Sequence, residues 1–117
     1  MKIILILEDS DERIGQFRKN FINAELIIVK TSKEAIIELK NKKFDIIFLD
    51  HDLGGKVFQT PGENTGYEVA QWISKNLKDS KVAIHSLNMP AVKVMKNCLP
   101  EAIICPFIWI KEIDWSK

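Results

Sequence analysis

Three ionisable side chains stand together where a largely apolar run of the sequence ends. Asp50, His51 and Asp52 directly follow residues 44–49 and precede a pair of glycines. Charged groups are costly inside a protein core unless they are paired or bound to a ligand. Carboxylates can hold a metal ion, and an imidazole can bind a metal or exchange a proton near neutral pH. The stretch therefore predicts the floor of a binding or active site.

Two other apolar runs end in polar residues in the same way. The run at the start of the chain is followed by Glu8 and Asp9, and a later run is followed by His85, Ser86 and Asn88. Hard carboxylate oxygens repel one another unless a cation lies between them, so the acidic residues suit Mg²⁺ with several waters retained, or Mn²⁺. The two imidazoles can add softer ligands or general acid–base groups.

Each of these residues also has a structural interpretation. The predicted metal ligands are four carboxylates, those of Glu8, Asp9, Asp50 and Asp52. Asp52 is equally suited to a turn, because it precedes Leu-Gly-Gly. Either histidine can hydrogen-bond a backbone carbonyl, while Ser86 and Asn88 can cap a helix that begins near Pro90. A gathering of this size on three strand ends is hard to explain by capping, so a functional site is the better interpretation.

The elements that must position these side chains alternate along the chain. Apolar runs predict strands at residues 3–7, 25–29, 44–49, 82–84 and 102–105. Apolar stripes at helical spacing predict four helices between them. Ser10, Thr31 and Thr65 are predicted to cap three of these helices, the last two with a glutamate at capping-box spacing.

Strand and helix alternate about five times, which calls for a parallel sheet covered on both faces. We expect an α/β fold, a flavodoxin-like, doubly wound five-stranded parallel sheet in the order 2-1-3-4-5, with a last helix that is short or missing. In that order strands 1, 3 and 4 are neighbours. Their polar carboxyl ends should therefore converge on one crevice.

Composition narrows the classes of protein. The 117 residues carry 17 basic and 16 acidic side chains, a balance that argues against a general nucleic-acid or membrane-surface binder. No apolar run has membrane-spanning length. Cys98 and Cys105 lack metal-ligand spacing and fit buried small hydrophobes. We expect one cytoplasmic domain over residues 1–117, without sequence-specific DNA binding.

The arrangement resembles the receiver domain of two-component response regulators. Glu8 and Asp9 match the acidic pair that holds Mg²⁺ in receivers, and Asp50 matches the phospho-accepting residue. The stretch at 65–70 is similar to the start of the third receiver helix. Ser86 falls where receivers carry a Thr or Ser that contacts the phosphoryl group. The resemblance covers nearly the whole chain.

Three features depart from that pattern. Cys105 precedes Pro106 where receivers carry a Lys, and His85 stands where they usually have an apolar residue. The loop at 50–66 is also longer. Receivers often have a cis peptide before this proline, so we expect one between residues 105 and 106. The tail aromatics Trp109 and Trp115 are expected to cap the sheet.

The stretches at 50–54 and 85–88 are similar to a divergent subgroup, the cyclic-phosphate-processing receivers. Their name implies a role on cyclic phosphate ends of nucleotides or RNA. A metal-dependent phosphoesterase would then use Asp50, His51 and His85 as catalytic residues, with Ser86 and Asn88 binding the phosphate of a small molecule or RNA end.

Two other functions remain open. In the first, the chain is a single-domain response regulator that a histidine kinase or a small phosphodonor phosphorylates on Asp50. The missing Lys counts against this function, and the intact acidic residues count for it. In the second, the site has lost catalysis and binds only phosphate or metal.

Overall fold

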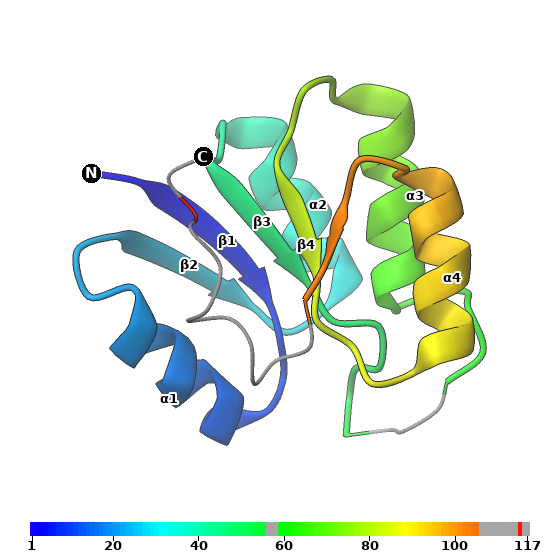
Figure 1. Cartoon of the computed structure of the whole chain (residues 1–117), viewed down its shortest axis with the longest axis horizontal. Helices are drawn as coiled ribbons and strands as arrows, with labels where there is room; N and C mark the ends of the chain where they lie inside the picture. Colours follow the sequence, from blue (N-terminus) through cyan, green and yellow to red (C-terminus); the bar gives the residue numbers. More distant parts are fainter. Residues whose placement is uncertain (56–58, 106–114, 116–117) are drawn as a thin grey trace.

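The computed structural model describes residues 1–55, 59–105 and 115, which form a parallel sheet between layers of helices (Figure 1). The strands are β1 (Ile3–Leu7), β2 (Glu25–Val29), β3 (Ile46–Leu49), β4 (Val82–Ile84) and β5 (Ile103–Ile104). All neighbouring strands pair in parallel, in the order β2-β1-β3-β4-β5. The predicted fold class and strand order are confirmed.

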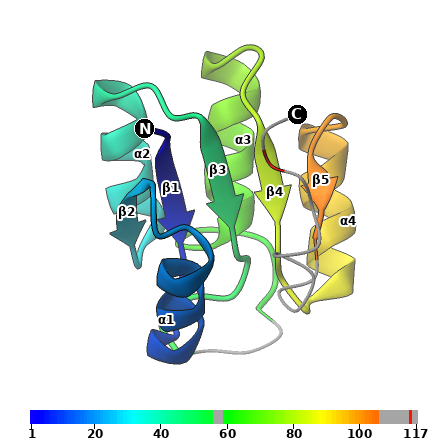
Figure 2. The ribbon, with the colours of Figure 1, turned by 60° about the vertical axis from the view of Figure 1, so that its left-hand side comes forward.

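The described helices lie on both faces of the sheet. They are α1 (Asp11–Asn20), α2 (Ser32–Asn41), α3 (Gly66–Asn76) and α4 (Met89–Cys98). The last three form one layer, and α1 lies on the opposite face (Figure 2). Central strands covered on both faces need apolar side chains at every position, which explains the unbroken runs of the sequence. None of the helices in the described part of the chain has the length and apolarity needed to span a membrane.

Alternate residues of each strand supply two separate cores. Leu5, Leu7 and Leu49 pack toward α2, α3 and α4, whereas Ile6 and Phe48 pack toward α1. On the α1 side the ring of Trp115 lies 4.9 Å from that of Phe48, measured between centroids. Trp115 therefore caps the sheet as expected, whereas Trp109 lies outside the described residues.

Two of the predicted helix caps form as expected. The Ser10 hydroxyl accepts a hydrogen bond from the backbone N–H of Arg13 at 3.4 Å, and the Thr31 hydroxyl accepts one from that of Glu34 at 3.1 Å. Each side chain satisfies a backbone donor that the first helical turn leaves without an intrahelical partner.

The capping box predicted at Thr65 does not form. The Thr65 hydroxyl donates instead to the carbonyl of Gly62 at 2.7 Å, and Glu68 accepts from the backbone N–H of Asn64 at 3.0 Å. Asn64 has φ of 51°, so the chain turns sharply just before the helix. The Thr65 side chain is consequently directed into the preceding turn, and the glutamate caps one residue earlier than the spacing predicts.

Two strands are shorter than predicted. Phe44 and Asp45 precede β3, where the Asp45 carboxylate accepts a hydrogen bond from the backbone N–H of Ile3 at 2.8 Å. Similarly, β5 covers only two of the four residues predicted for it. The 105–106 peptide bond and the expected short or missing last helix lie outside the described residues.

Gly66 at the start of α3 lies directly against the end of β3. A Cβ at this position would come within 1.9 Å of the carbonyl oxygen of Asp50 and 2.8 Å of its carbonyl carbon. The backbone N–H of Gly66 also donates to the carbonyl of His51 at 3.0 Å. Only glycine allows this approach, so α3 fixes the backbone of the polar segment that follows β3.

Substituting two glycines should have opposite effects on stability. We expect Gly66→Ala to lower the free energy of unfolding by about 1–3 kcal/mol, because the new methyl group overlaps backbone atoms. The matched control is Gly15→Ala in α1, where a Cβ meets nothing within 4 Å. This control should stabilise the protein by about 0.5–1 kcal/mol. Urea denaturation of both variants tests the expectation, and equal effects would contradict it.

Candidate functional site

Three polar side chains stand side by side at the carboxyl edge of the sheet. The last residues of β1, β3 and β4 are register partners and pack toward α2, α3 and α4. The next residue of each strand, Glu8, Asp50 or His85, faces the other way, toward α1. One ligand atom from each of the three lies within 4.8 Å of the others. The sheet register thus gathers two carboxylates and an imidazole.

Glu8 is fully buried and surrounded by donors. One carboxylate oxygen accepts from the backbone N–H groups of Asp9 and Ser10, at 3.0 and 3.1 Å. The other lies 3.0 Å from Nε2 of His85 and 3.4 Å from Nη1 of Arg13. Burial raises the pKa of Glu8, but the hydrogen bond and charge of His85, with smaller help from Ser10 and Arg13, hold that pKa below its ordinary value. Glu8 is therefore stabilised in its ionised form.

Asp50 is equally enclosed but less well compensated. Its Oδ1 accepts from the backbone N–H of His51 at 2.8 Å, and its Oδ2 lies 3.4 Å from Nη1 of Arg13. The pKa of Asp50 is raised to about 6, chiefly by burial and also by the charge of Glu8, although His85, Arg13 and the His51 N–H act to lower it. Asp50 is therefore the less stabilised of the two carboxylates in its charged form.

His85 is held mainly by aromatic packing. Its ring makes edge contacts with those of Phe17 and Phe48, at centroid distances of 5.3 and 6.3 Å. Its Nδ1 is buried and has no hydrogen-bond partner among the described residues. The ring is thereby oriented with Nε2 toward Glu8.

The donor set of these three residues fits a divalent cation. Carboxylate oxygens suit Mg²⁺ and Mn²⁺, and an imidazole nitrogen suits transition metals. The neighbouring Asp9 carboxylate accepts from the backbone N–H of Gly55 at 2.7 Å, on the loop after β3. The metal-ligand roles of Glu8, Asp9, Asp50 and Asp52 remain predictions. Of the two histidines considered as softer ligands, the geometry places His85 beside Glu8 and Asp50.

His51 belongs to a second polar cluster, beside the first. It is fully buried, and its Nδ1 lies 2.8 Å from Oδ1 of Asp52. The same oxygen accepts from the side-chain amide of Asn88 at 3.0 Å and from the backbone N–H of Gln59 at 3.1 Å. Asp52 therefore connects His51, Gln59 and Asn88 by hydrogen bonds, and it also lines the pocket described next. Its role as turn former or metal ligand stays a prediction.

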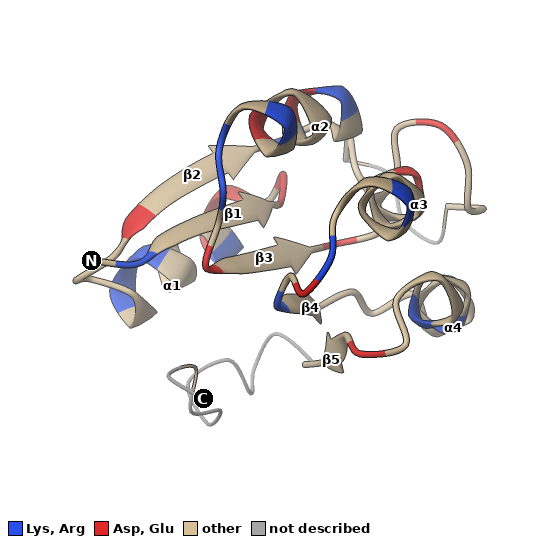
Figure 3. Ribbon diagram, turned by 90° about the horizontal axis from the view of Figure 1, so that it is seen from above, with Lys and Arg blue, Asp and Glu red and all other residues tan. Residues whose placement is uncertain are grey.

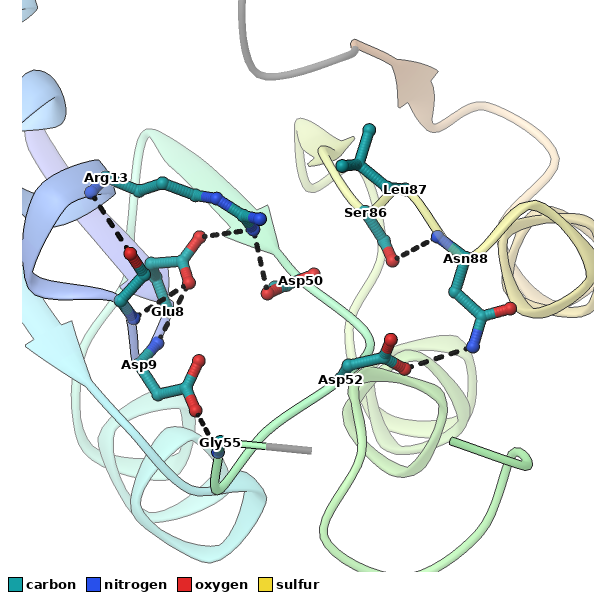
Figure 4. Close-up of a pocket in the computed structure, with 10 residues that line it drawn as sticks. Glu8, Asp9, Arg13, Asp50, Asp52, Gly55, Ser86, Leu87 and Asn88 are labelled. Atoms are coloured by element: carbon teal, nitrogen blue, oxygen red, sulfur yellow. Dashed lines mark hydrogen bonds and ion pairs between the residues drawn. The ribbon is translucent and has the colours of Figure 1, made fainter. Parts of the chain in front are cut away.

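The two groups open onto one pocket of about 230 Å³. Its lining residues are Glu8, Asp9, Ser10, Arg13, Asp50, Asp52, Gly55, Ser86, Leu87 and Asn88. The residues from β1 and α1 face those of the β4–α4 loop across it, with Asp50 and Asp52 between them (Figure 4). Acidic segments lie just beyond the tips of β1 and β3 (Figure 3). Neither histidine is among the lining residues, but His85 contacts Glu8 and His51 contacts Asp52.

The predicted phosphate-binding residues also have structural roles. The Asn88 side chain caps α4 by accepting from the backbone N–H of Ala91 at 3.3 Å, and its amide donates to the Gln59 carbonyl at 2.9 Å. The Ser86 hydroxyl accepts from the backbone N–H of Asn88 at 3.0 Å. Both residues line the pocket, and their contact with a phosphate stays a prediction.

Sequence reasoning missed Arg13. It lies in the first turn of α1, and its guanidinium reaches both Glu8 and Asp50. A cation is unfavourable in this part of a helix, where the helix dipole favours anions. That mismatch was the available signal for a partner outside the helix.

The raised pKa of Asp50 predicts a pH-dependent loss of stability without metal. Between the ordinary aspartate value and about 6, the folded state binds the proton more tightly than the unfolded state. This group's contribution to the free energy of unfolding therefore falls as pH rises through that window and stays lost above it. In EDTA, Asp50→Asn should be more stable than wild type at pH 7.5 by about 1–3 kcal/mol, with little difference near pH 4.

Urea denaturation at the two pH values measures this difference. Glu8 has a lowered pKa and contributes in the opposite direction, but it is present in both proteins. The control is Asp11→Asn, because Asp11 is exposed and outside the pocket. A destabilised Asp50→Asn at pH 7.5 would contradict the expectation. Mn²⁺ should then stabilise wild type more than Asp50→Asn.

Comparison with solved structures finds receiver domains. The Mn²⁺-bound form of response regulator Rcp1 is 21% identical, with a TM-score of 0.77 over 97% of this chain and 91% of that chain. Response regulator TrrA from Thermotoga maritima, in complex with Mg²⁺-BeF, is 20% identical, with a TM-score of 0.73 over 96% and 93%. The complex of histidine kinase ThkA with TrrA also matches, at 24% identity and a TM-score of 0.60, over 74% and 70%. These likenesses establish the fold.

The sequence comparisons identify the family. No curated protein matches the chain. Residues 3–101 match the cyclic-phosphate processing receiver domain, and this match covers most of the 117 residues. The chain therefore belongs to the family of cyclic-phosphate processing receiver domains.

Proposed function

We propose that the chain is a metal-dependent phosphoesterase that binds the cyclic phosphate end of a nucleotide or RNA in the pocket beside Glu8 and Asp50. The observation that carries the proposal is the grouping of Glu8, Asp50 and His85 within 4.8 Å, next to a pocket that Ser86 also lines. Phosphorylation of an aspartate would not require the buried imidazole. The family name and the donor set support the same class of substrate.

The size of the pocket favours the end of a larger molecule. Its volume of about 230 Å³ is below the roughly 300–1,000 Å³ of sites that enclose a drug-sized ligand. A phosphate and part of a sugar can enter, while the remainder of the ligand stays outside. Leu87, which is 66% exposed and lines the pocket, offers an apolar surface to that outer part.

The residues divide the chemistry between them. Glu8, Asp50 and His85 would hold the ion, which when bound supplies positive charge to the phosphoryl oxygens and favours deprotonation of water. Hydrolysis adds one water: a new P–O bond forms, the ring P–O bond breaks, and the proton from the water ends on the released hydroxyl. His51 would act as a positioning residue, because its imidazole holds Asp52 at the pocket wall. Ser86 and Asn88 would orient the phosphate.

An assay with nucleoside 2′,3′-cyclic phosphates and Mn²⁺ or Mg²⁺ tests the proposal. We expect a phosphomonoester product, detected by ³¹P NMR, and a loss of at least about 100-fold in Glu8→Gln and Asp50→Asn. His51→Ala should lower kcat and leave Mn²⁺ affinity near that of wild type. The control Asp11→Asn should keep full activity. Mn²⁺ binding without any turnover by wild type would contradict the hydrolase and leave a binding site.

The imidazole predicts a preference among metals. Because a nitrogen ligand favours transition metals over Mg²⁺, we expect Mn²⁺ to bind about tenfold tighter than Mg²⁺ or more. Calorimetric titration of wild type and His85→Gln measures the preference. The substitution should reduce it, and an unchanged ratio would show that His85 supports Glu8 without binding the ion.

A second candidate function is a switch phosphorylated on Asp50. It is favoured by Asp50 and Ser86 lining the same pocket, and by the similar structures of TrrA, one with Mg²⁺-BeF and one with a histidine kinase. Both Asp50 oxygens already have partners in this chain, which counts against it.

Beryllofluoride with Mg²⁺ distinguishes the two functions. A switch should show NMR shifts of amides near Asp50 and Ser86 that saturate with beryllofluoride and vanish in Asp50→Asn. The absence of such shifts in a protein that binds Mg²⁺ would exclude this candidate.

A further inference from the structure

We propose that Arg13 serves the site in two states: it is the counter-ion of Glu8 and Asp50 before a metal binds, and the phosphate-binding cation afterwards. The second role rests on the function proposed above, whereas the first is independent of it. Nothing in the sequence pattern assigns either role to this residue.

The first step is the position of the guanidinium. One nitrogen, Nη1, lies 3.4 Å from a carboxylate oxygen of Glu8 and 3.4 Å from one of Asp50. Arg13 extends from α1 across Glu8 toward Asp50 (Figure 4). It therefore bridges the same two carboxylates that would bind the ion.

Arg13 and a metal should therefore compete. The guanidinium and a metal ion each relieve the repulsion between Glu8 and Asp50, and each would bind the same carboxylate oxygens. Both distances are longer than the roughly 2.7–2.9 Å of a strong charge-assisted hydrogen bond, so these two contacts with the carboxylates are weak. Its side chain is 31% exposed, whereas those of Glu8 and Asp50 are 0% and 5% exposed. Arg13 is the partner that can move.

The charge of the pocket then gives the displaced guanidinium a role. Four carboxylates line it, those of Glu8, Asp9, Asp50 and Asp52, and Arg13 is the one cationic side chain among the described lining residues. A divalent ion leaves this set with excess negative charge, which repels a phosphate. A retained guanidinium reduces that repulsion, and its planar fork can donate two hydrogen bonds to phosphate oxygens.

The position of Arg13 on α1 is compatible with this movement of its side chain. Arg13 starts at the third residue after the Ser10 cap, and both residues line the pocket. A side chain released from Glu8 thus remains at the wall of the pocket. Its new partner can be a phosphate oxygen without any shift of the helix.

The test measures the affinities for Mn²⁺ and for phosphate, which replacement of Arg13 should change in opposite directions. In Arg13→Gln, Mn²⁺ alone should bind about 3–10-fold tighter, because a competing cation has been removed. Inorganic phosphate should bind the Mn²⁺-loaded variant about tenfold more weakly or worse, since a charge-assisted contact is lost. Calorimetry gives both constants. Arg13→Lys should keep Mn²⁺ affinity near wild type and show an intermediate phosphate affinity, because it retains charge without the planar fork.

The control is Arg18→Gln, an exposed cation of the same helix that does not line the pocket. Both affinities should be unchanged in it. A residue that merely holds the site together would weaken both affinities when replaced, and that result in Arg13→Gln would overturn the inference. An unchanged phosphate affinity in the same variant would overturn it equally. Absence of turnover by wild type contradicts only the proposed hydrolase, because both titrations are binding measurements.

Discussion

The parallel register of β1, β3 and β4 places Glu8, Asp50 and His85 at adjacent buried positions. The electrostatics of the site follow largely from that placement. Two carboxylates so near each other cannot both keep water shells, and their repulsion is stronger in a poorly solvated environment. The hydrogen bond and charge of His85, the backbone N–H of Ser10 and the charge of Arg13 keep the pKa of Glu8 low. Asp50 receives less compensation, and its pKa of about 6 records the difference. A bound cation would relieve this repulsion, so the arrangement that weakens the metal-free fold is the one that favours metal binding.

The same constraint connects the site to the packing around it. Glu8 accepts hydrogen bonds from Asp9 and Ser10, the two residues directly before α1. The position of that helix is therefore coupled to the ionisation of the site. On the other side of β3, the contact of Gly66 with the Asp50 carbonyl fixes the backbone by steric exclusion. Beneath the site, Phe17 and Phe48 hold the ring of His85. Three kinds of contact therefore position the ligand atoms: backbone hydrogen bonds to Glu8, steric contact at Gly66 and aromatic packing around His85.

The fold was largely predictable, whereas the site was predictable only in outline. Strands covered on both faces must be apolar throughout, so their runs and strand order could be inferred from sequence. Strand ends located the polar residues, but convergence alone does not say which face each occupies. Alternation along the strand separates Asp50, which faces α1, from His51, which pairs with Asp52. Arg13 and Gln59 escaped prediction because each reaches the site from outside the strand-end motifs, and only the folded chain shows those contacts.

The polar groups around Asp50 also bear on the proposed function. The resemblance to receivers implies an acidic pair, a metal and a hydroxyl group beside an aspartate that accepts a phosphoryl group. Here an imidazole occupies a register position beside that aspartate, a second imidazole fixes Asp52, and a guanidinium bridges the acidic residues. These groups lie after β4, in the loop after β3 and on α1, and each contacts a carboxylate that lines the pocket. Each contacts a charged group of a strongly acidic site, so together they are consistent with the proposed binding of a phosphate ester there.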